Sequence, residues 1–136
     1  MTNSEIVNKI YDICAEATED IGKEFSKNTG LPTSSSMVQE LATNIGFGLL
    51  YKYAAASVWY KISSSLSTTT QFENLNDIMD KFADKVFTDH FAFRSAITST
   101  SKEEWNNLIK GDKQTYSILK DYISRIDQII DTIDYD

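Results

Sequence analysis

His90 is the only histidine of the chain, and a histidine beside carboxylates can act as a general base or as part of a nucleophilic triad. Asp84 and Asp89 lie close to it in the sequence. A serine nucleophile in one large class of triad enzymes sits in a Gly-x-Ser-x-Gly elbow, and this sequence contains no such motif. We therefore interpret His90 as a surface or helix-end residue and predict that the protein is not an enzyme.

Carboxylates recur with helical spacing in one part of the chain. Asp77, Asp80 and Asp84 stand at positions i, i+3 and i+7, which places them on one face of a helix. Such carboxylates can hold Mg²⁺ together with substrate phosphates. Lys81 and Lys85 alternate with them, however, and mixed charge opposite an apolar stripe is typical of a solvent-exposed face. We favour the solvated face.

The remaining potential metal ligands are scattered. Zinc sites are usually built from clustered cysteines and histidines, whereas this chain has one of each, far apart. The acidic residues near the C-terminus lack the glycine and the oxygen-ligand spacing of a calcium loop. They are Asp121, Asp127, Asp131, Asp134 and Asp136. We expect neither a metal nor a cofactor, and we interpret Cys14, which has apolar neighbours, as a small core residue.

Aromatic rings beside cations are the other chemically suggestive feature, because together they can stack bases and hold phosphates. One segment contains Tyr51, Tyr53, Trp59 and Tyr60, interleaved with Lys52 and Lys61. We favour the interpretation that these rings fill a core. The two lysines project on opposite sides of a helix, so a basic patch needs cations from other segments as well. The residues predicted to contact nucleic acid are Lys52, Lys61, Arg94 and Arg125.

Composition and charge limit the classes of partner. The 136 residues include 13 Lys and Arg against 20 Asp and Glu, a net charge of −7, so the molecule as a whole repels nucleic acid and anionic membranes. Any contact with phosphates must be local. A hydrophobic content of 41% at this length is typical of one globular domain, residues 1–136, that needs neither disulfides nor metal. A single cysteine suits a reducing compartment.

Turn residues are sparse, with one Pro and five Gly, which favours long helices over many short strands. Apolar residues at three- and four-residue steps predict a first helix over residues 5–27, capped by Ser4. Gly30 and Pro32 are expected to end it. We predict an all-α fold, a single compact bundle of five or six helices.

A second helix is predicted over residues 36–62, with Ser36 and Gln39 forming a capping box. Its predicted seam consists of Val38, Leu41, Ile45, Leu49, Tyr53, Ala56 and Tyr60. Residues 45–60 are apolar on nearly every side. We therefore expect this helix at the centre of the bundle or beneath a partner.

The same stretch bears on membrane insertion and on packing. At 16 residues, with Lys52 inside it, it is shorter than the roughly 20 apolar residues that a bilayer requires, so we predict a buried helix. Gly46 and Gly48 are expected to let a neighbouring backbone approach closely. No basic segment precedes an apolar run at the N-terminus, and we predict a cytoplasmic protein without a signal peptide.

The second half of the chain is predicted to contain shorter helices. Residues 63–70 hold seven Ser or Thr and one Leu, which indicates a flexible connector. Thr70 and Glu73 are predicted to form a capping box that opens a third helix. The apolar stripe of this helix is predicted to contain Phe72, Leu75, Met79, Phe82 and Val86.

The last third of the sequence leaves one alternative open. Residues 88–98 either continue the third helix or form a short helix of their own. Ser101 is predicted to cap a further short helix that Gly111 ends. A final helix is predicted over residues 112–133.

Residues 37–50, with the sequence MVQELATNIGFGLL, resemble a helix of the small all-α subunit of type III-B CRISPR effector complexes. In that family an Asn-Gly-Leu-like segment begins an apolar stretch that ends near a lysine. The order of elements is also similar, with a long first helix, a Pro-containing turn at residues 31–32, this helix, a connector and further helices. Residues 112–126, with Tyr116, Leu119 and Ile123, are similar to the family's last helix.

This resemblance implies a non-catalytic structural subunit of an RNA-guided antiviral ribonucleoprotein complex. Several copies would stack along the guide and target RNA, contact repeated backbone subunits and line the target channel with basic side chains. The implied partners are other protein subunits, including copies of the chain itself, and the RNA backbone. No membrane partner is implied.

A protein-only helical module is the alternative function. Examples are an immunity or inhibitor protein and a viral coat or accessory protein, which would use an acidic surface as a decoy or a helix as a docking ridge. Salt separates the two hypotheses, because contacts with phosphates weaken steeply as salt rises whereas apolar contacts change little.

We expect Lys52→Glu, Arg94→Glu and Arg125→Glu each to weaken RNA association while leaving the fold intact, because each replaces a cation beside a phosphate by an anion. Each lost phosphate contact should reduce the slope of log K against log salt by about one. Titrations with single-stranded and duplex RNA at two ionic strengths measure this. Unchanged binding in all three variants would show that the positions are wrong.

Overall fold

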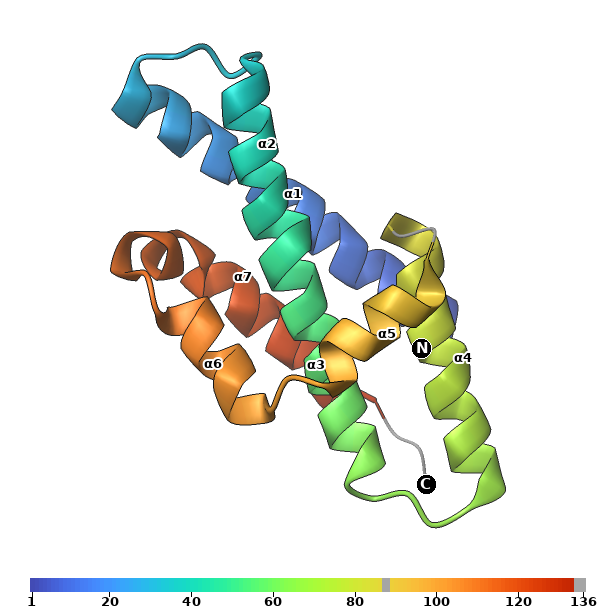
Figure 1. Ribbon diagram of the computed structural model, residues 1–136. Coiled ribbons are helices and arrows are strands. Elements are labelled where there is room, and N and C mark those ends of the chain that lie inside the picture. The colour runs from blue at the N-terminus through green and yellow to red at the C-terminus, as the bar shows by residue number, and fades with distance from the viewer. Residues whose placement is uncertain (87–88, 134–136) are drawn as a thin grey trace.

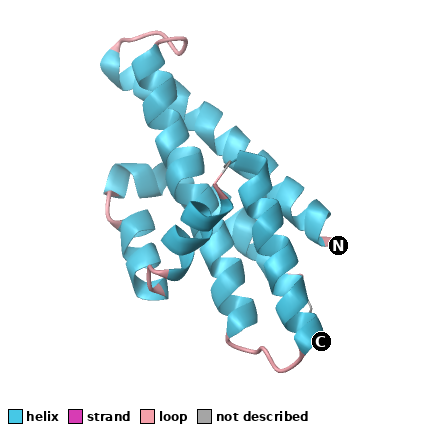
Figure 2. Cartoon of the chain, turned by 45° about the vertical axis from the view of Figure 1, so that its right-hand side comes forward, coloured by secondary structure: helices cyan, strands magenta, loops and turns pink. Residues whose placement is uncertain are grey.

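Helices make up every regular element in residues 1–86 and 89–133, the part of the chain that this computed structural model describes (Figure 1, Figure 2). In chain order they are α1 (Asn3–Thr29), α2 (Ser36–Ile45), the π-helix η1 (Gly46–Tyr51), α3 (Lys52–Ser63), α4 (Thr69–Val86), α5 (His90–Thr98), α6 (Lys102–Lys110) and α7 (Lys113–Asp131). Because α2, η1 and α3 form one continuous run, the described residues build six helical rods. The prediction of an all-α fold with five or six helices is confirmed.

Helix α1 begins and ends at side chains suited to those positions. Thr2 caps its start, since the Thr2 hydroxyl accepts a hydrogen bond from the Glu5 N–H at 3.1 Å. The prediction of Ser4 as the cap is wrong, because Ser4 already lies inside the first turn. Gly30 ends the helix in the left-handed conformation with φ of 75°, and its N–H donates to the Ser26 carbonyl at 3.0 Å, as predicted.

The predicted second helix is continuous but irregular. Ser35, not Ser36, precedes it, and the Ser35 side chain makes no capping hydrogen bond, so the predicted capping box is wrong. Within the run, η1 replaces the α-helical hydrogen bonds by i→i+5 bonds. Of the predicted seam, Val38, Tyr53 and Ala56 are buried, whereas Leu41 in α2 is 44% exposed. The π-helix itself fully buries Leu50 and Tyr51.

The contact between η1 and α1 requires a glycine at position 46 but not at position 48. A Cβ added to Gly46 would lie 1.7 Å from Oγ1 of Thr18 and 3.2 Å from the Cys14 carbonyl oxygen, so only glycine fits. Gly48 is exposed, and a Cβ there would meet nothing closer than the Asn44 Cβ at 3.9 Å. The expected close approach is therefore correct for Gly46 and wrong for Gly48.

The centre of the fold lies where η1 and α3 cross the other helices. Helix α3 packs against α4, α5, α6 and α7, and three consecutive alanines, residues 54–56, are buried in it. The fully buried Tyr51 donates its hydroxyl hydrogen to the Phe82 carbonyl at 2.5 Å, and its ring lies within 6.5 Å of the rings of Tyr11, Phe82 and Phe93. The interpretation of Tyr51 as a core residue is confirmed.

Helix α4 starts earlier than its sequence signals predicted. The Thr68 hydroxyl accepts from the Gln71 N–H at 3.1 Å, and the Gln71 side chain accepts from the Thr68 N–H at 3.2 Å. The capping box is therefore two residues before the predicted pair Thr70 and Glu73. Phe72, which was assigned to the apolar stripe, is 53% exposed, whereas Phe82 on that stripe is fully buried.

The remaining helices settle the alternative left open by the sequence. Helix α5 is separate from α4, and the Asp89 carboxylate caps it by accepting from the Ala92 N–H at 3.0 Å; residue 88 lies outside the described residues. Ser101 caps α6 as predicted, accepting from the Glu104 N–H at 3.1 Å. Asp112 caps α7 through the N–H groups of the first turn.

One part of the fold projects beyond the rest. Helices α1 and α7 run antiparallel, joined by the pairs Glu16–Arg125 and Asp20–Tyr122. Beyond Asp20, α1 continues alongside α2 and leaves the other helices (Figure 1, Figure 2). We call residues 21–45 the arm and the remaining described residues the body.

Gly46→Ala is expected to lower the free energy of unfolding by about 1–3 kcal/mol, because the added methyl group forces Thr18 and the Cys14 carbonyl apart. Gly48→Ala is the matched control, and it should be neutral or stabilising by up to about 1 kcal/mol, since alanine favours a helix and has room there. Urea denaturation followed by circular dichroism measures both. Equal stability of the two variants would contradict the role of Gly46.

Candidate functional site

Two side chains with catalytic potential, those of His90 and Cys14, have structural settings in the fold. Nε2 of His90 lies 2.5 Å from Oδ1 of Asp84, so the pair joins the start of α5 to the end of α4. Both side chains are substantially exposed. Cys14 is fully buried, and burial raises the pKa of its thiol, which disfavours the reactive thiolate.

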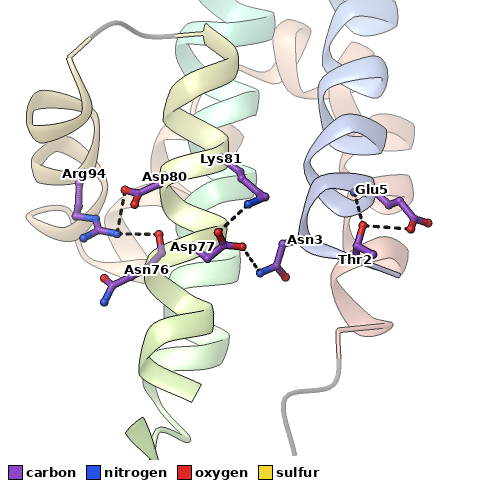
Figure 3. Close-up of polar contacts among 8 residues, drawn as sticks. All are labelled: Thr2, Asn3, Glu5, Asn76, Asp77, Asp80, Lys81 and Arg94. Carbon is purple, nitrogen blue, oxygen red and sulfur yellow. Dashed lines mark hydrogen bonds and ion pairs between the residues drawn. The ribbon is translucent and has the colours of Figure 1, made fainter. Parts of the chain in front are cut away.

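The three aspartates of α4 have separate partners, and those of Asp77 and Asp80 are drawn in Figure 3. Asp77 accepts hydrogen bonds from the Asn3 amide at 2.8 Å and from Lys81 Nζ at 2.7 Å, and these bonds lower the pKa of its carboxyl group. Asp80 lies 3.7 Å from the guanidinium of Arg94. Because Asp84 pairs with His90, the three carboxylates are not joined in one site.

No cluster of three or more His, Cys, Asp or Glu side chains suited to a metal ion occurs in residues 1–86 and 89–133. Asp134 and Asp136, which belong to the acidic group at the C-terminus, lie outside these ranges. In the same ranges no helix has both the length and the hydropathy needed to cross a membrane.

The four predicted nucleic-acid contacts are distributed over the molecule. Lys61 Nζ donates to the Ile130 carbonyl at 2.8 Å, near the end of α7. The Arg94 guanidinium binds α4, where it donates to the Asn76 carbonyl at 3.3 Å (Figure 3). Lys52 is half-buried and also has an interaction partner.

Arg125 is held between α1 and α7. Its guanidinium donates to Oε2 of Glu16 at 2.9 Å and lies 5.5 Å from the centre of the Tyr122 ring. The hydrogen bond lowers the pKa of Glu16 and raises that of Arg125. The structure thus turns Lys61, Arg94 and Arg125 toward three different protein neighbours and does not bring them together. The positive charge of each of these three cations is therefore already partly compensated by a protein oxygen.

The arm carries a feature that the sequence reading missed. Met37 is 58% exposed and Leu41 is 44% exposed, and their i, i+4 spacing places them on one face of α2. Leu41 had been assigned to the seam because it follows Val38 by three residues, whereas the buried residues of α2 are Val38 and Ala42. Four other large apolar side chains are exposed in residues 1–86 and 89–133; they are Met1 before α1, Phe72 on α4, Phe91 on α5 and Leu108 on α6.

A cleft separates the arm from the start of α7. Its volume is about 550 Å³. Phe25 and Ile45 line it from the arm, and Ile118 lines it from α7. Glu24 and Asp112 contribute carboxylates to its lining. Volumes of this order accommodate a few apolar side chains, and helical proteins commonly bind partner helices in such grooves.

Comparison with protein-family models, with curated proteins and with solved structures finds no match to this chain. The resemblance of residues 37–50 to the CRISPR small subunit therefore stays a prediction. Interpretation of the site rests on the side chains themselves.

The surroundings of Asp127 on α7 disfavour the ionised form of its carboxyl group. Partial burial is the main cause that raises its pKa, and the neighbouring carboxylate of Asp131 raises it further, while Lys110 opposes the shift. An acid whose pKa is higher in the folded protein than in the unfolded chain stabilises the fold only while it is protonated. Its ionisation therefore removes stability as the pH rises through that raised pKa.

Asp127→Asn is expected to raise the melting temperature at pH 7, with a gain below about 1 kcal/mol because the group is only partly buried. At pH 3, where the aspartate is protonated, the gain should disappear. Asp121→Asn removes the same charge from another exposed position on α7 and serves as the control. Thermal denaturation at the two pH values measures the difference, and an equal gain at both would contradict this account.

Proposed function

We propose that this protein is a non-catalytic helical subunit that binds another protein through its arm. The observation that carries the proposal is the exposed apolar pair Met37 and Leu41 on α2, beside a cleft lined by Phe25, Ile45 and Ile118. Adjacent exposed apolar side chains on a soluble domain are typical of protein-binding surfaces.

The polar contacts favour a protein partner over a phosphate backbone. Arg94 and Arg125 are engaged with carboxylates, and Lys61 with a carbonyl oxygen. With a net charge of −7, the chain also lacks the overall electrostatic attraction that nucleic-acid binding uses. A helix-docking module gains its affinity mainly from apolar burial and needs no free cations.

A subunit of an RNA-guided antiviral complex is the second candidate. It is favoured by one observation, namely that the resembling segment, residues 37–50, covers α2 together with most of η1. In that case the arm would contact a neighbouring subunit or copy of the chain, and RNA would bind after Arg94 or Arg125 left its carboxylate.

We expect the double variant Met37→Ser, Leu41→Ser to lose its protein partner, with affinity reduced by about tenfold or more, because two apolar anchors are removed from one face. Affinity purification of the tagged chain from its native cells, with and without ribonuclease, identifies the partner. Titration of the purified components then measures the affinity.

The matched control is Phe72→Ser, Leu108→Ser, which removes two exposed apolar side chains outside the arm and should bind as the wild type does. A protein partner that is retained after ribonuclease supports the first candidate. Partner loss on ribonuclease treatment and at high salt supports the RNA-guided complex. Equal binding by both double variants would overturn the role of the arm.

A further inference from the structure

We infer that the arm is hinged to the body, with glycines in α1 and η1 as the flexible points, so that the cleft beside α7 can widen and narrow. This inference concerns the motion of the arm and does not depend on the identity of a partner. It rests on where the arm is anchored, on the glycines, and on the π-helix at its base.

The body holds α1 firmly only as far as the base of the arm. Arg125 binds Glu16 at 2.9 Å, and the Tyr122 hydroxyl binds the Asp20 carboxylate. Past Asp20, α1 borders the cleft with Glu24, Phe25 and Asn28. Helix α2 packs mainly against α1 and η1, whereas α3 packs against α4, α5, α6 and α7. The arm is therefore a pair of helices supported chiefly at one end.

Glycines lie where α1 and the run of α2 and η1 enter the arm. At two of them, Gly22 and Gly48, the surrounding packing leaves room for a larger residue. A Cβ on Gly22 would lie 3.8 Å from the Ala42 Cβ and 3.9 Å from Val38, which is ordinary contact. Gly48 has similar room. A glycine inside a helix makes the backbone more flexible. At Gly22 and Gly48 no close packing contact that needs a glycine offsets this flexibility. Gly46 differs, because its tight contact with Thr18 fixes η1 on α1 and can serve as the pivot.

The junction of α2 and η1 supplies the second flexible element. Single π-turns within α-helices occur frequently at functional sites, and hinge residues commonly lie at the ends of helices. Because Gly46 lies at this junction, a change of backbone angle there moves α2 while η1 and α3 stay in the body. Phe25 and Ile45 would then move relative to Ile118 across the cleft.

Spin-label distance measurements test the hinge. In a Cys14→Ala background, labels at Ser34→Cys on the turn of the arm and Gln114→Cys on α7 should give a broad distance distribution. A control pair within the body, Asn107→Cys on α6 and Ser124→Cys on α7, should give a narrow one; all four positions are exposed.

The variant Gly22→Ala, Gly48→Ala should narrow the distribution between the arm and α7, because alanine stiffens both helices and fits at both positions. The same variant in the unmodified protein should slow amide hydrogen exchange in residues 22–26 and 46–51, a readout that requires no labels and keeps Cys14. A wild-type distribution as narrow as the control, or amide exchange unaffected by the two alanines, would overturn the hinge.

Discussion

The fold depends on the close contact between η1 and α1. Gly46 lies against Thr18 and the Cys14 carbonyl with no room for a side chain, and this contact places the π-helix directly on the longest helix. With η1 held there, Leu50 and Tyr51 both point into the core, and Tyr51 reaches the Phe82 carbonyl of α4. One glycine contact thus links the first helix, the central run and the fourth helix. It also marks the level at which the arm leaves the body.

The helices were predictable because apolar spacing is a local property of the sequence, whereas the π-turn at Gly46–Tyr51 was not. A π-turn forms when tertiary contact outweighs the preference for i→i+4 bonding, and the contact with Thr18 lies far away in the sequence. The predicted N-caps of α1, α2 and α4 were wrong for a different reason, whereas that of α6 was confirmed. Near Thr68 several adjacent hydroxyl residues can cap equally well by sequence, so the choice among them depends on where the helix packs.

The candidate site was less predictable than the fold, because pairing between charged side chains depends on which helices meet. The sequence identified Arg94 and Arg125 as cations, but their partners, Asp80 and Glu16, lie on other helices. The exposure of Leu41 also depended on which face of α2 is buried, and that face carries Val38 and Ala42. Function therefore has to be argued from surfaces that only the assembled helices reveal, and the arm with its neighbouring cleft is the most distinctive of these.

The bond from Lys61 to the Ile130 carbonyl explains how the chain tolerates an acidic ending to its last helix. The carbonyl end of a helix is electronegative, and Asp127 and Asp131 add negative charge there, so the ammonium group acts as a counter-charge. Acetylation of Lys61 would neutralise that ammonium and remove this counter-charge from the helix end. An enzyme that acetylates exposed lysines would thus weaken the junction of α3 and α7 without touching the arm.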